Sequence, residues 1–359
     1  MIYIVEPAGG YHRSGGYRYN ERLCEHSDAF VRVRVPGDLE VSRKPESAAA
    51  STAASTDAVL VDSLFLSQRL PVLPPQLMDL PRILMAHSLP SLLPAEAAAP
   101  EAAAREAAEC ESLKGYVGAV APSAYMARAL HKRGMPEHAI AVQPPAPVID
   151  GRITAARMSS WWPQERDPDV RDQDARLRVL NVANYLPAKG QLELIELIAG
   201  LPESSISCVL AGSAVPDPRH ADMLSNRIDG LGIGDIVHMV REPDDRSLAQ
   251  LYAAADLYVS LSHMESYGIT IAEAMSFGLP VLGTTGHAVA EVFGPAVRCV
   301  RPDAARHAMS HLIDSAAERA RLASASRKMA DSLPDWPVVA GGLAHAVGIL
   351  AQRPQRSTT

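Results

Sequence analysis

Short apolar runs of strand length alternate with helix-like segments along most of the chain. In the first part, apolar runs cover 1–7, 57–65, 81–89 and 115–121, and helical patterns cover 19–27, 94–111 and 122–134. Such alternation is typical of βα units built around a parallel sheet. The series stops at 140–148, where repeated prolines exclude further helix.

A second series of the same kind follows a polar, proline-broken segment at 149–176. Because this segment lacks apolar periodicity, it is interpreted as a linker. Apolar runs then cover 177–186, 205–212, 235–240, 256–262 and 279–285, and helical patterns cover 191–199, 219–230 and 247–255. The sequence therefore predicts an α/β protein of two Rossmann-like, doubly wound domains facing across a cleft, with ligands at the carboxyl ends of the strands.

The expected domain limits follow from these changes of pattern. At 359 residues, the length alone favours two domains. The prediction is a first domain at 1–150, a linker at 151–176, a second domain at 177–335, a closing helix at 336–352 and a polar tail at 353–359.

Composition narrows the possible partners and the location. The formal net charge is −7 and no Lys/Arg block is visible, which argues against a nucleic-acid partner. The four cysteines are scattered and form no Cys-x-x-Cys pair, so neither a zinc site nor a disulfide framework is indicated. No signal peptide and no apolar run of about 18 residues is found. We therefore expect a cytoplasmic protein without integral membrane contact.

A glycine-rich turn that includes Gly15 and Gly16 follows the first apolar run and leads into a helix. Such a turn exposes backbone N–H groups to an anion and is a candidate phosphate loop. Its spacing matches neither the dinucleotide fingerprint nor the nucleoside-triphosphate loop. The simpler interpretation, a flexible turn that needs glycine only for positive φ, stays open.

Lys189 stands just before a helix at the end of an apolar run in the second domain. The helix dipole disfavours a cation at a helix N-terminus, so a bound phosphate would explain this lysine better than solvent does. A solvated lysine is the alternative.

Two carboxylates, Glu265 and Glu273, lie eight positions apart in the mostly uncharged stretch 265–281. The first falls in a loop, the second about one turn inside a helix, and the amides at the start of that helix lack intrahelical partners. A nucleotide-sugar site would use these groups well: one carboxylate accepts hydrogen bonds from the sugar, the other accepts them from the ribose, and the amides bind the phosphate between them. The simpler interpretation has Glu265 capping the helix and Glu273 in solvent.

At this point the sequence resembles the retaining GT-B glycosyltransferases of family four. The stretch 265–281 is similar to that family's signature of two glutamates separated by seven residues, and the likeness extends through most of the chain. Looser similarities lie at 14–23, 115–130, 185–198 and 334–347. The resemblance implies a first domain that binds the acceptor, a second that binds the donor nucleotide, and a C-terminal helix that crosses back to the first domain.

The resemblance also implies a role for each matching residue. Glu265 would contact the donor sugar's hydroxyls, Glu273 the ribose, and Lys189 the donor phosphates. The remaining implied contacts are the amides of Gly15 and Gly16 on the phosphates, the amides of Tyr267, Gly268 and Ile269 on the distal phosphate, and His87 near the C6 hydroxyl of the sugar.

Two positions depart from the family pattern. Asn184 stands where the family usually has an arginine, so one phosphate charge is missing or comes from Arg241 or Arg13. The segment around Arg241 is expected to border the base. Pro144-Pro145-Ala146 replaces the usual Pro-Asn-Gly at the end of the first domain, which affects interdomain details and not the fold.

The implied activity is retaining transfer of a sugar from a nucleotide-diphosphate sugar to an acceptor hydroxyl, with the departing phosphate helping to deprotonate the acceptor. No metal and no cofactor beyond this co-substrate would be needed. Asp pairs at 167–169 and 172–174 are interpreted as a solvated part of the linker, since arginines surround them.

Two alternatives stay open: a nucleotide-sugar epimerase, and a catalytically silent nucleotide-sugar-binding protein, which Asn184 makes conceivable. Residues 1–150 hold more acidic than basic side chains, which favours a soluble small-molecule or oligosaccharide acceptor over an anionic lipid.

Overall fold

The computed structural model describes residues 1–7, 14–35, 57–67, 73–92, 99–151, 176–202 and 205–354. Two compact units divide the chain: Met1–Ala146 with Pro334–Thr359, and Pro147–Leu333. The first unit therefore ends a little before the expected residue 150 and also takes in the closing helix. Nearly all of the expected linker, with both Asp pairs, and the end of the tail lie outside the described residues.

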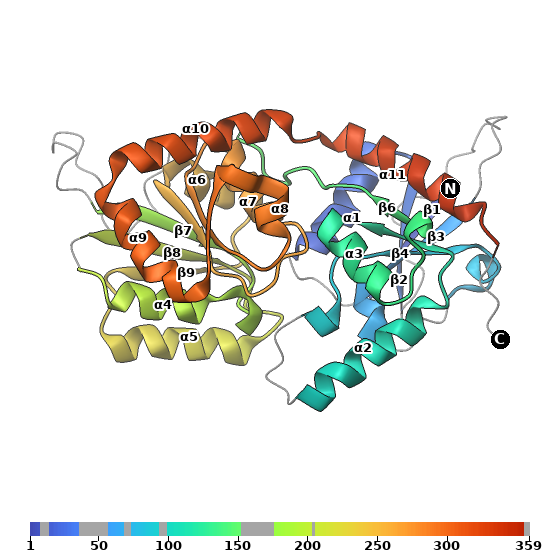
Figure 1. Cartoon of the computed structure of the whole chain (residues 1–359), viewed down its shortest axis with the longest axis horizontal. Coiled ribbons are helices and arrows are strands. Elements are labelled where there is room, and N and C mark those ends of the chain that lie inside the picture. Colours follow the sequence, from blue (N-terminus) through green and yellow to red (C-terminus); the bar gives the residue numbers. More distant parts are fainter. Residues whose placement is uncertain are drawn as a thin grey trace. The chain divides into compact units, whose positions relative to one another are not determined.

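The first unit is a parallel sheet covered by helices on both faces (Figure 1). Its strands run in the order β2-β1-β3-β4-β5-β6. They are β1 Ile2–Pro7, β2 Phe30–Val35, β3 Ala58–Asp62, β4 Arg82–Met85, β5 Gly118–Ala121 and β6 Ile140–Val142. The helices are α1 Gly15–His26, α2 Ala99–Leu113, α3 Ala124–Lys132 and α11 Trp336–Ala351.

Alternate strand residues of this sheet face opposite helix layers. Val5, Val61 and Leu84 belong to the core shared with α2 and α3, whereas α11 packs over β3, β4 and β5 on the other face and contacts α1. The closing helix thus returns to the first unit, as the sequence predicted. Trp336, at its first position, packs edge-on against Tyr19 with ring centroids 5.4 Å apart.

Strand β2 was not predicted. It reads Phe-Val-Arg-Val-Arg-Val, so its apolar positions alternate with arginines instead of forming a continuous run. This pattern belongs to an edge strand, and β2 lies at the end of the sheet.

The second unit repeats the architecture with strand order β12-β11-β10-β7-β8-β9, all parallel. The strands are β7 Leu177–Val182, β8 Ile206–Gly212, β9 Val237–Arg241, β10 Leu257–Ser260, β11 Val281–Thr284 and β12 Val297–Val300. The helices are α4 Gln191–Ala199, α5 Pro218–Leu231, α6 Asp245–Ala254, α7 Ile269–Ser276, α8 Ala288–Phe293, α9 Ala305–Asp314 and α10 Ala316–Ser332.

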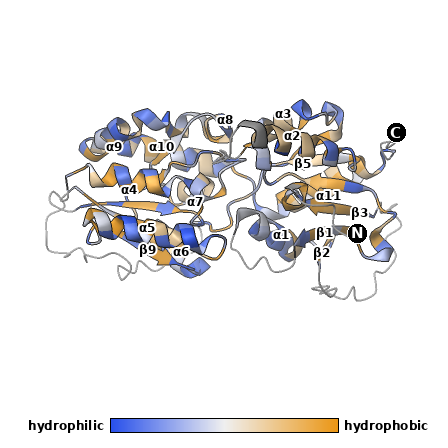
Figure 2. Ribbon diagram, turned by 90° about the horizontal axis from the view of Figure 1, so that it is seen from below, coloured by the Kyte–Doolittle hydropathy of each residue, from blue (hydrophilic) through white to orange (hydrophobic). Residues whose placement is uncertain are grey.

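Two apolar cores fill the faces of this second sheet. One core packs α4, α5 and α9 against the sheet, and the other packs α6, α7 and α8. Figure 2 shows the consequence, with apolar colouring on the strands and polar colouring on the outer sides of the helices. The strands β8, β10 and β11 are buried along their whole length, which explains why they read as nearly continuous apolar runs.

Each sheet has one place where the strand order reverses. In the first unit this switch point lies between β1 and β3, and in the second it lies between β7 and β10. In sheets of this kind, ligands bind outside the carboxyl ends of the strands at such a point. In the described residues no single helix is long and apolar enough to cross a membrane, although the consecutive pair α10 and α11 together reaches that length and composition.

Candidate functional site

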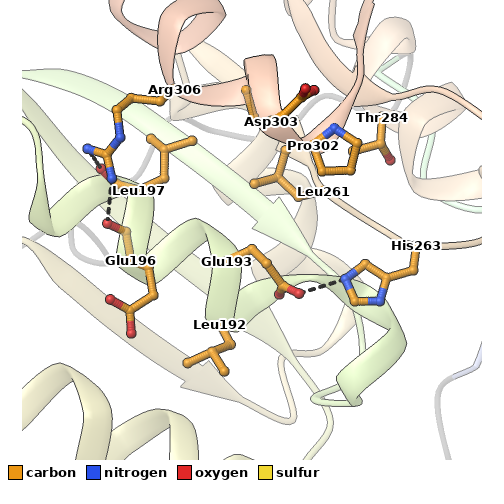
Figure 3. A pocket seen from close by; sticks show the side chains of 11 residues that line it. Leu192, Glu193, Glu196, Leu197, Leu261, His263, Thr284, Pro302, Asp303 and Arg306 are labelled. Atoms are coloured by element: carbon orange, nitrogen blue, oxygen red, sulfur yellow. Dashed lines mark hydrogen bonds and ion pairs between the residues drawn. The ribbon is translucent and has the colours of Figure 1, made fainter. Parts of the chain in front are cut away.

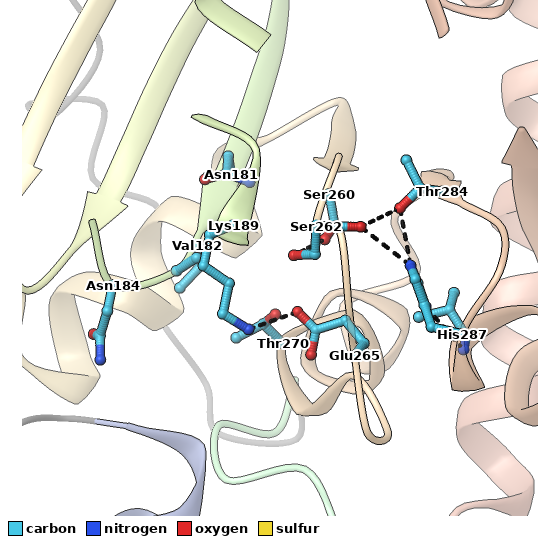
Figure 4. A network of polar contacts seen from close by, with 12 residues as sticks. Asn181, Val182, Asn184, Lys189, Ser260, Ser262, Glu265, Thr270, Thr284 and His287 are labelled. Atoms are coloured by element: carbon cyan, nitrogen blue, oxygen red, sulfur yellow. Dashed lines mark hydrogen bonds and ion pairs between the residues drawn. The ribbon is translucent and has the colours of Figure 1, made fainter. Parts of the chain in front are cut away.

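An ion pair occupies the switch point of the second sheet. Lys189 ends a short 3-10 turn, Pro187–Lys189, that follows β7, and Glu265 follows β10. Nζ of Lys189 lies 2.7 Å from Oε1 of Glu265 (Figure 4). The lysine side chain is 28% exposed and the glutamate 15%, so the pair is partly open to a ligand. The structure thus brings together two residues that the sequence proposed for one site.

Gly190 makes this pairing possible. Its φ is +68°, and a Cβ atom there would lie 2.2 Å from the carbonyl oxygen of Leu261. Only glycine lets the turn approach the backbone after β10 so closely. The amide of His263 donates to the carbonyl of Ala188 at 2.9 Å and joins the same two loops. Lys189 is therefore held beside Glu265 by backbone contacts and not only by charge.

Glu265 is ionised at neutral pH. Burial by itself would raise the pKa of this carboxyl group, but the charge and hydrogen bond of Lys189 outweigh it, with smaller contributions from Ser262 and His287. The resulting pKa is lower than the ordinary value. A carboxylate that only accepts hydrogen bonds suits ligand hydroxyl groups.

A buried network of polar side chains lies next to Glu265. His287 Nε2 lies 2.9 Å from Oγ1 of Thr284 and 3.1 Å from the carbonyl oxygen of Ser262, and the Ser260 and Ser262 hydroxyls lie 3.2 Å apart (Figure 4). Burial lowers the pKa of His287, although the charge of Glu265 opposes this. The sequence analysis missed this network, for which a histidine two residues after the apolar run 279–285 was the available signal.

Helix α7 begins at an open turn next to Glu265. Gly268 has φ +103° and precedes the first helical residue, and no side chain caps the helix. Within the described residues, no hydrogen bond engages the amides of Gly268 and Ile269. The Tyr267 ring is buried against Phe293, with centroids 5.4 Å apart. Because Glu265 pairs with Lys189, the alternative in which it caps the helix is wrong; the phosphate contacts of these amides stay a prediction.

Glu273 lies inside α7 and is 1% exposed, so the alternative in which it is solvated is also wrong. Its Oε1 accepts from the amide of Ile149 at 3.2 Å, and its Oε2 accepts from the hydroxyl of Tyr252 at 2.8 Å. Sequence reasoning missed both partners, which lie far from Glu273 in the chain. The contact with a ribose stays a prediction.

Asn184 and Arg241 stand apart from the ion pair. The carbonyl oxygen of Asn184 accepts from the buried Gln191 side chain at 3.1 Å, and its own side chain lies outside the network of Figure 4. Arg241 ends the edge strand β9 and lies 3.5 Å from Asp222. Neither therefore contacts Lys189 or Glu265, and Arg13 lies outside the described residues.

In the first unit, the structure brings the predicted glycines and histidine together. Gly15 and Gly16 open α1, where the Ser14 hydroxyl accepts from the amide of Tyr17 at 3.3 Å. A Cβ atom on Gly16 would lie 3.0 Å from Cδ2 of His87, so this glycine also makes room for the imidazole.

His87 follows β4 and is 15% exposed. Nε2 lies 3.2 Å from Oδ1 of Asn20 and 3.8 Å from Oδ2 of Asp62. Burial lowers the pKa of His87, whereas the charges of Asp62 and Glu6 act in the opposite direction. The sequence analysis had named none of these three partners.

A pocket of about 430 Å³ lies on the α4 and α9 side of the second unit (Figure 3). His263 Nε2 lies 2.7 Å from Oε1 of Glu193 in its lining, and Arg306 donates to the carbonyl of Leu197 at 3.3 Å. The pocket reaches the surroundings of the ion pair through Leu261, His263 and Thr284, whereas neither Lys189 nor Glu265 lines it. Among the described residues, no three His, Cys, Asp or Glu side chains gather as a metal site.

Comparisons with known sequences agree with this geometry. Residues 164–329 match the sequence profile of the family Glycosyl transferases group 1. Over 178 residues the chain is 29% identical to the MMP alpha-(1->4)-mannosyltransferase of Mycolicibacterium hassiacum, covering 47% of this chain and 42% of that protein. Over 107 residues it is 36% identical to the lipopolysaccharide glucosyltransferase WaaG of Escherichia coli, covering 30% and 27%. The matched stretches thus span less than half of either relative.

Solved structures resemble the chain over nearly its full length. HepE from Anabaena, in complex with UDP and glucose, superposes with a TM-score of 0.72 at 17% identity and covers 97% of this chain and 99% of that one. The structure of WaaG gives a TM-score of 0.63 at 17% identity, covering 96% and 98%. The predicted fold class is confirmed, and the epimerase alternative finds no support. Residues 164–329 are thus similar to the glycosyl transferases group 1 family, and the fold of the chain is that of the GT-B glycosyltransferases.

Proposed function

We propose that the protein transfers a sugar, with retention of anomeric configuration, from a nucleotide-diphosphate sugar to an acceptor hydroxyl. The observation that carries this proposal is the pair of Lys189 and Glu265 beside the open amides at the start of α7. A cation and free amides suit a diphosphate, and an ionised carboxylate suits the hydroxyl groups of a sugar.

On the donor side, Glu265 accepts hydrogen bonds from the transferred sugar and Lys189 neutralises the diphosphate. The amides of 267–269 bind the distal phosphate. Glu273 accepts from the ribose hydroxyls. Its two oxygens also accept from the amide of Ile149 and the hydroxyl of Tyr252, which fix the carboxylate in place.

The first unit supplies the remaining contacts. The amides of Gly15 and Gly16, at the start of α1, bind the diphosphate, and His87 bonds to a hydroxyl of the transferred sugar. The close approach of Gly16 to His87 supports this assignment, because it brings the glycine turn and the histidine together at the switch point of the first sheet.

The reaction proceeds at the front face of the sugar. As the bond to the diphosphate breaks, a phosphate oxygen takes the proton of the attacking acceptor hydroxyl. The protein stabilises the charge that develops on the leaving group through Lys189 and the α7 amides, an effect for which each lost donor lowers the rate about 10²- to 10³-fold. Neither a metal ion nor a further cofactor takes part in this proposal.

The acceptor is proposed to be a soluble small molecule or oligosaccharide, and the location the cytoplasm. The names of the relatives point to different substrates, among them a mannosyltransferase and a lipopolysaccharide glucosyltransferase. The acidic balance of residues 1–150 is the feature of this chain that favours a soluble acceptor.

A thermal-shift screen of nucleoside diphosphates and their sugars tests the donor site. A ligand at 100 times its dissociation constant stabilises the folded protein by about 2.7 kcal/mol. We expect one nucleoside diphosphate and its sugar to raise the melting temperature clearly above the nucleoside alone. If none of them shifts it, the proposal is wrong.

The donor so identified is then incubated with an acceptor panel, with and without EDTA, and the product anomer is assigned by NMR. Retention and unchanged rates in EDTA are expected. Binding without transfer or hydrolysis would favour the catalytically silent alternative, and a new sugar nucleotide formed from donor alone would contradict transfer.

A further inference from the structure

A buried polar cluster lies at the switch point of the first sheet. Glu6 is the last residue but one of β1, Asp62 ends the adjacent strand β3, and His87 follows β4, the next strand in the sheet. Asn20 covers them from α1. Glu6 and Asn20 are fully buried and Asp62 is 1% exposed. Polar side chains buried to this degree are held by specific hydrogen bonds, and their donors and acceptors can be assigned.

Glu6 is held as a carboxylate by two arginines of the edge strand. Arg32 donates to its Oε1 through Nε at 2.9 Å and Nη2 at 2.6 Å, and Arg34 donates to the same oxygen through Nε at 3.2 Å. Three charge-assisted hydrogen bonds on one oxygen offset the cost of burying this carboxylate. Its second oxygen, Oε2, faces Asn20 and can only accept.

This fixes the orientation of the Asn20 amide. Its Nδ2 donates to Oε2 of Glu6 at 3.2 Å and to Oδ2 of Asp62 at 3.3 Å. The reversed amide would place an oxygen against Oε2 of Glu6, which is repulsive. Oδ1 therefore points to Nε2 of His87, 3.2 Å away. Because an amide oxygen only accepts, the hydrogen of the neutral imidazole must be on Nε2, which leaves Nδ1 as an acceptor.

The ring is also held in place sterically. Gly16 lies against one part of it, since a Cβ there would approach Cδ2 to 3.0 Å, and the Tyr19 ring packs edge-on with centroids 5.3 Å apart. Among the described residues no partner engages Nδ1 of His87. With 15% of the side chain exposed, the imidazole is both fixed and accessible.

We propose that Asn20 is a positioning residue that holds His87 as the Nε2–H tautomer, so that Nδ1 accepts a hydrogen bond from a hydroxyl of the transferred sugar. This inference rests on the proposed function for its ligand. It also predicts which sugars the site prefers. An unprotonated Nδ1 can accept a hydrogen bond from a hydroxyl group, but it repels a carboxylate and forms no hydrogen bond with a sugar that lacks the hydroxyl at that position. A site built for a hydroxyl discriminates against ligands that lack one, because its own polar group is then left unpaired.

Nitrogen NMR of the ¹⁵N-histidine-labelled full chain, without ligand and at pH 8, tests the tautomer directly. The two nitrogens of His87, assigned by their loss in His87→Gln, are expected to show the Nε2–H pattern. His287 is an internal reference of the same tautomer, since its Nε2 faces the carbonyl of Ser262 and its Nδ1 accepts from the amide of Val289. His131, whose Nδ1 lies 3.1 Å from the carbonyl of Met135, is the opposite reference. An Nδ1–H pattern for wild-type His87 would overturn the proposal.

Asn20→Leu keeps the size of the side chain but removes the acceptor. In this variant we expect His87 to become a mixture of tautomers while His287 is unchanged; an unchanged His87 would also overturn the proposal. If Asn20→Leu does not fold, the wild-type measurement still decides the tautomer.

Donor kinetics separate this inference from the proposed function. Wild type is expected to lose at least tenfold in kcat/KM for a donor whose contacting hydroxyl is replaced by hydrogen, scanned position by position, and Asn20→Leu to lose most of that discrimination. If both proteins discriminate equally between the donors, the role of Asn20 is contradicted and the proposed function is not. If no nucleotide sugar binds to either protein, the proposed function and the hydroxyl ligand fail, whereas the tautomer result stands.

Discussion

Lys189 and Glu265 are separated by 76 positions in the sequence, yet Nζ of the lysine lies 2.7 Å from Oε1 of the glutamate. The pair forms where β7 and β10 lie side by side and their following loops diverge. The two opposite charges neutralise each other in the free protein. A diphosphate that arrives there gains a cation without the cost of burying a new one.

Replacing Lys189 with methionine should therefore affect both stability and catalysis. Glu265, which is 15% exposed, would lose its counterion, at a cost of about 1–3 kcal/mol. Turnover should fall about 10²- to 10³-fold, because a charge that stabilises the leaving group is gone. Urea unfolding and initial rates measure the two effects. Arg227→Met, which breaks an exposed ion pair with Glu196 in the same unit, is the control and should leave turnover unchanged. Equal turnover in the two variants would contradict the role of Lys189.

Gly190→Ala should cost more than Gly232→Ala, although the two glycines have nearly the same φ, +68° and +67°. An alanine in the left-handed region costs about 1–2 kcal/mol at either position. At Gly232 nothing lies near the added Cβ, whereas at Gly190 it would meet the Leu261 carbonyl at 2.2 Å. The turn that carries Lys189 must then move, so activity should fall as well. Equal unfolding free energies for the two variants would show that the close approach does not matter.

The positions of most strands and helices could be predicted from the sequence, because strands buried on both faces are continuous apolar runs. Strand β2 could not, since Arg32 and Arg34 interrupt its apolar pattern in order to reach Glu6. Likewise, the glutamate spacing and Lys189 pointed to one site, but their direct contact depends on the backbone approach at Gly190.

The supporting residues were harder to predict for a physical reason. Asn20 looks like any polar residue on a helix until three strand ends are brought against it. The partners of Glu273, Tyr252 and Ile149, are chosen by tertiary packing and not by spacing. Residues whose function is to orient another residue leave little trace in a single sequence.

We expect Glu265 to contribute to the loss of folding stability at acidic pH, the acid limb of the stability profile. Its pKa in the folded protein is below the ordinary 4.5, so the unfolded chain binds the proton first as the pH falls. The stabilisation is therefore complete above about pH 5 and is lost as the pH falls through the lowered pKa. Unfolding free energies measured between pH 3 and pH 8 should show a shallower acid limb in Glu265→Gln.

In the same experiment, Lys189→Met is expected to reverse the direction in which Glu265 changes the unfolding free energy with pH. Without the lysine charge, burial is the dominant influence and raises the pKa of Glu265. The carboxylate should then destabilise the folded protein at neutral pH, and stability should increase on mild acidification. A profile parallel to that of the wild type would show that Lys189 does not set this pKa.

Tyr252→Phe removes the hydroxyl that donates to Glu273 at 2.8 Å. The carboxylate is 1% exposed, so water replaces this donor poorly and the cost should be about 1–3 kcal/mol. Tyr258→Phe is the matched control. Its hydroxyl bonds to the uncharged Thr270 side chain at 2.8 Å, so its loss should cost about 1 kcal/mol. Chemical unfolding of both variants measures the difference, and a larger loss in Tyr258→Phe would contradict the stronger contribution expected of the bond to Glu273.

The ribose contact proposed for Glu273 has its own test. Glu273→Gln keeps the shape and one acceptor oxygen, but its amide nitrogen cannot accept from a hydroxyl. Wild type should bind the nucleoside diphosphate found by the thermal-shift screen more tightly than the 2′,3′-dideoxy analogue, because two hydroxyls on a carboxylate form charge-assisted hydrogen bonds. In Glu273→Gln this preference should shrink about tenfold or more, which corresponds to about 1.4 kcal/mol. Calorimetric titration of both ligands gives the ratio. Since misfolding would weaken both ligands alike, only a change in the ratio reports on the ribose; an unchanged ratio would leave Glu273 as a residue of the fold, tying Ile149 to α7.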